Sequence, residues 1–224
     1  MESAYRNLGF FLLALLPVFI AGFWIPYLSE IPRFDPSITP PVHVHAVLLF
    51  SWIALLIIQP LAIRYRAFSA HRLIGRMSYV LMVFIVPFTL AMIWKEYHEK
   101  LLAGESMAFA LQAEFVSAAQ LVVTVAMYVL AVVSIKERDV PAHMRYMICI
   151  ALFFLPAGLA RTLGYGFSVK QMTSQTVCLA VIETCLAALI AFDFRRHLNP
   201  RPYVVALLAY NATAVAWIAL GRPV

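Results

Sequence analysis

The residues of this sequence best suited to chemistry are histidines, and most stand at the ends of apolar segments. The segment from Pro41 to Arg76 carries His43 and His45 at one end and His71 near the other. Two histidines one residue apart on a regular helix cannot bind the same metal ion, since two positions turn the helix by about 200°. The His-x-His pattern therefore predicts one inward-facing histidine, His45, rather than a metal site.

His45 begins a polar seam along its helix. His45, Trp52 and Gln59 are seven residues apart. A helix that advances about 100° per residue keeps all three within about 40° of one direction. We therefore expect the face of the helix that carries these side chains to point into the protein.

A glutamate and an arginine should share the depth of His45. Counted from the outer ends of their segments, His45 and Arg161 lie about one helical turn in and Glu114 about two. An isolated charge in hydrocarbon costs at least about 2.5 kcal/mol, so Glu114 and Arg161 are expected to pair. The alternative reading is a structural ion pair that joins two helices. The predicted outer ligand-binding cluster consists of His43, His45, Trp52, Glu114 and Arg161.

Three further histidines stand at the opposite side, each with an arginine within four residues. Three histidines and a carboxylate could hold zinc with an activated water, and two histidines could hold a haem iron. Basic residues also collect at the inner membrane surface without binding any ligand. The predicted inner cluster is His71, Arg72, His143, Arg145, Asp193 and His197, with His71, His143 and His197 as candidate metal ligands and Asp193 one helical turn before His197.

The composition excludes a soluble globular domain. Of the 224 residues, 63% are hydrophobic and 12% are charged, and the mean hydropathy is +0.86. A membrane span needs about 20 apolar residues in helical form. We predict one all-α membrane bundle over residues 1–224, with no soluble domain and seven spans, six being possible. The first apolar run is predicted to be a span rather than a cleaved signal, because it is too long for a signal and no small-residue cleavage site follows it. The spans are expected at about 8–28, 42–64, 74–95, 107–134, 143–164, 172–193 and 202–220.

The basic residues predict the orientation of the bundle. With the N-terminus inside, eleven of the seventeen lysines and arginines lie on the cytoplasmic side, which the positive-inside rule favours. The C-terminus is then outside. Because the basic residues are spread over several loops, the net charge of +6 gives no sign of nucleic-acid binding. The eleven residues are Arg6, Arg64, Arg66, Arg72, Arg76, Lys136, Arg138, Arg145, Arg195, Arg196 and Arg201.

Several of these motifs together resemble the DUF2306-like family of bacterial multi-pass membrane proteins. The motifs are His-x-His at a helix start, Trp52 and Gln59 at intervals of seven, then HRLIGR from His71 and His-x-Arg from His143. The resemblance runs from about His43 to Arg161 and implies a location in the bacterial inner membrane but no particular activity. It groups His45, His71, Arg72, His143, Arg145 and Arg161 as one set.

Three functions fit these patterns. The first is a redox protein that binds haem b, a quinone or a similar small ligand, and the second is a non-catalytic accessory subunit of a larger membrane complex. The third is a metal-dependent hydrolase at the cytoplasmic face, with zinc less favoured than haem or quinone. Binding or redox chemistry ranks above hydrolysis because no further glutamate or serine is placed on that side as a base or nucleophile. The expected partners are the lipid bilayer and, for the second function, other subunits.

Overall fold

The computed structural model describes residues 2–33 and 38–221, and every regular element in these ranges is a helix. Two short helical turns, Ser3–Tyr5 and Leu28–Glu30, flank the first pair of helices, and a π-helical turn, Thr162–Gly166, extends the sixth. The main helices are α1 (Leu8–Ala14), α2 (Leu16–Trp24), α3 (Pro40–Arg64), α4 (Phe68–Leu102), α5 (Met107–Lys136), α6 (Val140–Arg161), α7 (Gln171–Arg195) and α8 (Arg201–Leu220).

Seven helical segments are long and apolar enough to cross a membrane, which confirms the predicted all-α bundle of seven spans. The first span, Ser3–Trp24, includes both α1 and α2. Pro17, in the first turn of α2, has no N–H to continue the hydrogen-bond ladder, and the helix is interrupted at Leu15. The largest departure from the predicted bounds is α4, whose 35 residues extend beyond both ends of its apolar run.

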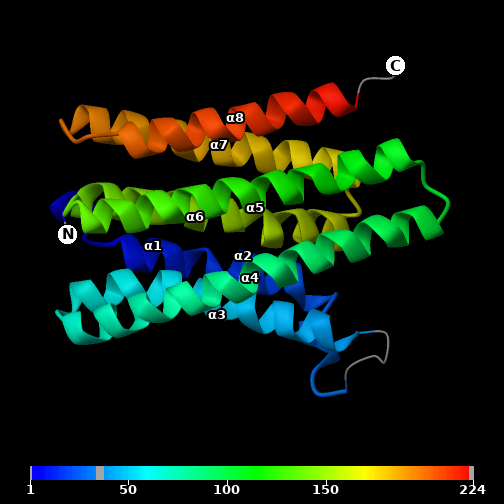
Figure 1. Ribbon diagram of the computed structural model, residues 1–224, viewed down its shortest axis with the longest axis horizontal. Coiled ribbons are helices and arrows are strands. Elements are labelled where there is room, and N and C mark those ends of the chain that lie inside the picture. Colours follow the sequence, from blue (N-terminus) through cyan, green and yellow to red (C-terminus); the bar gives the residue numbers. More distant parts are fainter. Residues whose placement is uncertain (1, 34–37, 222–224) are drawn as a thin grey trace.

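The helices run along one common axis, and the first described turn, Ser3–Tyr5, and the last residues of α8 lie at opposite ends of the bundle (Figure 1). The hairpins α3–α4, α5–α6 and α7–α8 form three tiers, and α1 and α2 lie between the first two tiers. Helix α6 is the best-buried helix, since every residue from Ile148 to Leu155 is buried. We call the end that carries the first residues the N-terminal end, and the other the opposite end.

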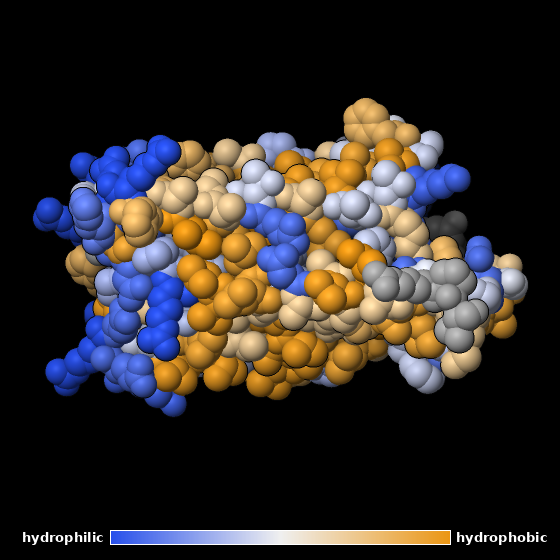
Figure 2. Space-filling view, turned by 90° about the horizontal axis from the view of Figure 1, so that it is seen from above, coloured by the Kyte–Doolittle hydropathy of each residue, from blue (hydrophilic) through white to orange (hydrophobic). Residues whose placement is uncertain are grey.

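The surface of the bundle has the pattern that a bilayer requires. In Figure 2 apolar side chains form a broad belt, and hydrophilic side chains gather most densely at the N-terminal end. An apolar belt between two polar ends matches the hydrocarbon core between two headgroup layers. The chain is therefore a multi-pass membrane protein.

Three turns at the N-terminal end share one backbone geometry. Arg66, Arg138 and His197 adopt left-handed conformations, with φ of 59°, 63° and 56°. The next residue in each turn donates its N–H to the carbonyl five positions earlier, at 2.8 to 2.9 Å. This is the Schellman ending of a helix. Because the turns before α4 and α6 have the same backbone geometry, the two helices begin in the same way. Their first residues also show a short sequence similarity, SAHRLIGR and PAHMRYM.

Helices α2 and α6 approach closely through two glycines. A Cβ on Gly22 would overlap the backbone of Gly158, and a Cβ on Gly158 would lie 2.8 Å from the Val18 carbonyl oxygen. Small residues allow this backbone contact between membrane helices. It holds the first span against the centre of the bundle.

Candidate functional site

A buried arginine links the first residues of the chain to the end of α7 at the N-terminal end of the bundle. Arg145 on α6 is 1% exposed. Its Nε donates to Asp193 Oδ2 at 2.5 Å, and its Nη2 donates to Glu2 Oε2 at 2.8 Å. A third bond runs from Nη1 to the Pro141 carbonyl oxygen at 3.2 Å. The arginine therefore has two carboxylate partners, as a buried cation requires.

Two tyrosines complete this network. Tyr5 donates its hydroxyl to Asp193 Oδ1 at 2.5 Å, and Tyr203 donates to the Tyr5 oxygen at 3.2 Å. The Arg145 guanidinium carbon lies 5.2 Å from the centre of the Tyr5 ring. With both carboxylate oxygens of Asp193 and both edges of Arg145 occupied, this network joins helices and offers no open ligand position.

The structure separates Asp193 from His197, which the sequence placed one turn apart on a continuous helix. Helix α7 ends at Arg195, and His197 takes the left-handed position of the turn and is exposed. Across residues 2–33 and 38–221, no three residues among His, Cys, Asp and Glu lie together in a way that could hold a metal ion. The three histidines of the predicted inner cluster are thus not one ligand set.

His71 and His143 instead form an equivalent pair. His71 is the fourth residue of α4, and His143 is the fourth residue of α6. Each contacts, through Nδ1, the carbonyl oxygen twelve positions earlier: His71 that of Gln59 at 3.4 Å and His143 that of Ala131 at 2.9 Å. The repeated turn thus gives both imidazoles the same placement at the same end of the bundle.

The two hydrogen bonds determine which ring nitrogen is available. A carbonyl oxygen only accepts, so Nδ1 carries the proton in each neutral ring and Nε2 keeps its lone pair. Within the part of the chain that the structure describes, neither Nε2 has a hydrogen-bond partner. Both rings are half-buried, and they lie near enough for their charges to interact. Gln59 also fixes the His71 backbone by donating Nε2 to its carbonyl oxygen at 3.1 Å.

The predicted seam of α3 does face the interior. Trp52 is 0% exposed and Gln59 is 9% exposed. Each of the three seam residues has a buried polar atom without a hydrogen-bond partner among the described residues: His45 Nδ1, Trp52 Nε1 and Gln59 Oε1. Buried polar atoms without partners are rare in native proteins, so a line of three marks a candidate path for a polar ligand or water.

Aromatic rings surround the middle of this seam. The Trp52 ring stacks on Phe154 with centroids 6.2 Å apart and meets the edge of Tyr128 at 5.6 Å. The Tyr128 hydroxyl in turn shares a 2.7 Å hydrogen bond with Ser78. Burial of Ser78 was not predicted, although its spacing of seven from His71 puts the two on similar sides of α4.

Glu114 forms an ion pair with Lys100 and not with Arg161, the partner expected from the sequence. Glu114 accepts a hydrogen bond from Lys100 Nζ at 2.7 Å, and both side chains are largely buried. The physical reason is the length of α4, which continues to Leu102 and turns sharply into α5. Lys100 is thereby brought beside Glu114, fourteen positions later.

Arg161 lies nearby without an ion pair among the described residues. Its Nη1 donates to the Ala157 carbonyl oxygen at 2.9 Å, and its guanidinium carbon lies 4.9 Å from the centre of the Phe23 ring. The charge of Arg161 acts on both His45 and Glu114, so the three share one region of the opposite end. Glu114 is therefore paired with Lys100 and not with Arg161.

His43 points away from the seam, as two positions on a helix require. Its Nδ1 lies 2.9 Å from the Tyr27 hydroxyl. Burial raises the pKa of Tyr27, which keeps the phenol protonated at neutral pH.

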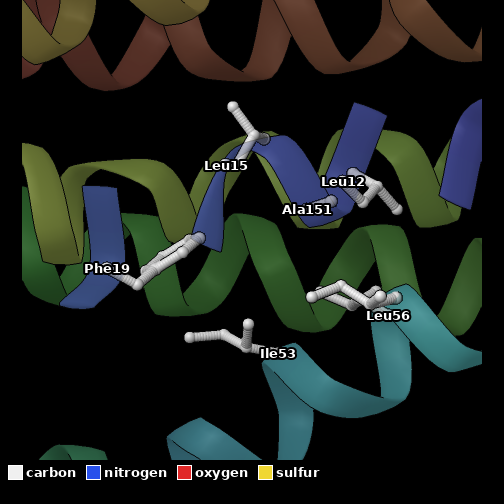
Figure 3. Close-up of a pocket in the computed structure, with 7 residues that line it drawn as sticks. Leu12, Leu15, Phe19, Ile53, Leu56 and Ala151 are labelled. Carbon is white, nitrogen blue, oxygen red and sulfur yellow. The ribbon is translucent and has the colours of Figure 1, made fainter. Parts of the chain in front are cut away.

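A small apolar cavity inside the bundle is not a ligand site. It has a volume of about 10 Å³ and is lined by seven apolar residues from α1, α2, α3 and α6, including Leu12, Phe19 and Ile53 (Figure 3). A water molecule needs at least about 10–15 Å³ and two or more polar partners. The cavity is a small packing gap beside the break between α1 and α2.

Comparison of the chain with protein-family models, with curated proteins and with solved structures found no match.

The Lys100–Glu114 pair gives a test of the revised geometry. We expect Lys100→Met to destabilise the protein by about 1–3 kcal/mol, because a largely buried carboxylate loses its charged donor. Unfolding in mixed micelles, analysed as a double-mutant cycle with Glu114→Gln, should give a coupling energy larger than the cycle of Arg161→Met with Glu114→Gln. Equal coupling in the two cycles would contradict the assignment of Lys100 as the partner.

Proposed function

We propose that this chain is a redox protein of the bacterial inner membrane that binds a b-type haem through His71 and His143. The observation that carries the proposal is the equivalence of the two imidazoles. They stand at the fourth position of two helices that start at the same end of the bundle, and each presents an unpaired Nε2.

The hydrogen bonds of both rings suit axial ligation. A histidine that binds iron through Nε2 commonly donates its Nδ1 proton to a carbonyl or carboxylate, which fixes the tautomer and the ring orientation. Gln59 and Ala131 supply such carbonyls. A haem held in this way would supply one-electron chemistry.

Arginines near His71 fit the acidic edge of a haem. Arg72 and Arg76 lie one and five positions after His71, are exposed, and form no ion pair with any described residue. Guanidinium groups bind carboxylates well, and the propionates of haem are carboxylates. We assign Arg72 and Arg76 to the propionates.

The orientation of the bundle follows from the same basic residues. Arg64, Arg66, Arg72, Lys136 and Arg138 belong to or flank turns at the N-terminal end. The positive-inside rule supports a cytoplasmic location for this end, with the N-terminus inside and the C-terminus outside. The haem would then lie near the cytoplasmic surface.

A second ligand, a quinone, is favoured by one observation at the opposite end. His45 Nδ1 is buried without a hydrogen-bond partner among residues that the structure describes, and Arg161 is close enough to act on it electrostatically. A quinone headgroup offers carbonyl oxygens as acceptors for both side chains. Quinone extracted from the purified wild type, and its loss from His45→Ala and Arg161→Met, would support this ligand.

An absorption spectrum tests the haem directly. The protein, purified in mild detergent from cells supplied with iron and a haem precursor, should show a Soret band and a sharpened α band after reduction with dithionite. His71→Ala and His143→Ala should each lose most of the Soret absorbance, since each removes one of the two iron ligands.

His98→Ala provides the matched control. His98 also has its Nδ1 bonded to a backbone carbonyl, that of Trp94 at 2.9 Å, but on the far stretch of α4. Its substitution should leave the spectrum unchanged. A wild-type protein without haem, or a Soret band that survives both His71→Ala and His143→Ala, would refute the proposal.

A further inference from the structure

An acidic residue, Glu183, occupies the middle of the apolar belt. Glu183 is the central residue of the 25-residue helix α7 and is half-buried. In the two described stretches of the chain, the Glu183 carboxyl has no hydrogen bond and no ion pair. A charged side chain at the bilayer centre is energetically costly, so this position needs an explanation.

An exposed amide lies at the same depth on the neighbouring helix. Asn211 is the eleventh of the 20 residues of α8, which packs against α7. It donates one N–H to the Leu207 carbonyl oxygen at 2.9 Å, and its second N–H and its carbonyl oxygen have no hydrogen-bond partner among the described residues. Figure 2, which looks onto α7 and α8, shows hydrophilic atoms in the middle of the apolar belt on this face.

The exposed side of α7 also carries a row of small side chains. Thr176, Ala180, Thr184 and Ala188 recur every four residues, and all four are exposed. The two threonine hydroxyls donate to carbonyls of their own helix, at 2.9 and 2.7 Å. Small side chains at this spacing let the backbone of a second membrane helix approach closely.

We propose that the α7–α8 face binds a second copy of this chain, related by a two-fold axis along the membrane normal. Such an axis places equal depths opposite each other, so Glu183 of one copy meets Asn211 of the other. The free amide N–H of Asn211 donates to a carboxyl oxygen of Glu183. The two-fold contact repeats this pair and gives all four side chains a partner.

This chemistry favours a second copy over a different protein. A foreign partner would need its own acid-binding group at the bilayer centre, whereas a second copy supplies the complementary amide from the same face. The inference is independent of haem binding, since Glu183 and Asn211 are on other helices than His71 and His143.

The dimer is tested with the full chain in lipid vesicles. We expect fluorescence energy transfer between labelled copies in phosphatidylcholine–phosphatidylglycerol vesicles, with a dissociation constant raised at least tenfold by Glu183→Leu and by Asn211→Leu. Phe84→Leu, on the exposed face of α4, is the control and should leave the transfer unchanged. Glu183→Gln should retain most of the association, because one amide pairs with another.

Crosslinking adds a readout that does not depend on affinity. With Cys149, Cys178 and Cys185 changed to alanine, Thr184→Cys should form a disulfide between copies under mild oxidation, and Phe84→Cys should not. The proposal is overturned by a wild type that is monomeric at all lipid ratios. It is equally overturned by association that Glu183→Leu leaves intact, or by a different protein that co-purifies in a Glu183-dependent manner.

Discussion

Asp193→Ala is expected to destabilise the protein by about 3–5 kcal/mol, because it leaves a buried arginine without its main partner. Asp193 is 0% exposed, and it accepts from both Arg145 and Tyr5. The remaining acid, Glu2, is more exposed and lies in the first residues of the chain. The free energy of unfolding in mixed micelles measures the loss.

Two further variants separate the charge effect from simple loss of packing. Asp193→Ala combined with Arg145→Met should be less destabilising than Asp193→Ala alone, because no unpaired charge remains in the interior. His197→Ala, four residues later on an exposed turn, should change the stability by less than about 0.5 kcal/mol. A double variant with a lower free energy of unfolding than Asp193→Ala would show that Arg145 does not depend on this carboxylate.

Gly22→Ala is expected to cost about 3 kcal/mol, at the upper end of the usual range for overpacking. The added Cβ would overlap the backbone of Gly158, and backbone atoms cannot move aside as the end of a flexible side chain can. Helices α2 and α6 would have to separate. The first span would then lose part of its contact with the centre of the bundle.

Gly164→Ala is the matched control for this substitution. A Cβ on Gly164 would meet nothing within 4 Å, so only the local helix propensity changes. Thermal unfolding in the same detergent should show a much lower midpoint for Gly22→Ala and a midpoint close to wild type for Gly164→Ala. Similar midpoints for the two variants would contradict the close approach of α2 and α6.

The seven spans and the polar seam of α3 were predictable because both depend on local periodicity. Twenty apolar residues require a helix in a bilayer, and a spacing of seven keeps side chains on one face whatever the rest of the chain does. The common direction of the His45, Trp52 and Gln59 side chains could be predicted without knowing which helices surround them.

Partners across the bundle were not predictable, because depth alone does not determine which helices are adjacent. Glu114 and Arg161 share a region, but the extension of α4 beyond its apolar run brought Lys100 closer to Glu114. Asp193 was expected beside His197, and the left-handed turn separated them. The role of Glu2 and Tyr5 had no local signal, although a buried arginine always implies that acidic partners exist somewhere.

The bond between Tyr5 and Asp193 has a consequence for how the protein is made. The two residues are 188 positions apart, so the first span is synthesised long before its carboxylate partner. Arg145 likewise emerges 143 positions after Glu2. During translation the N-terminal segment is therefore in the membrane without its hydrogen-bond partners. The network is complete only after α7 has been synthesised. Truncated chains that end before residue 193 should therefore be better targets for membrane proteases than the full-length protein.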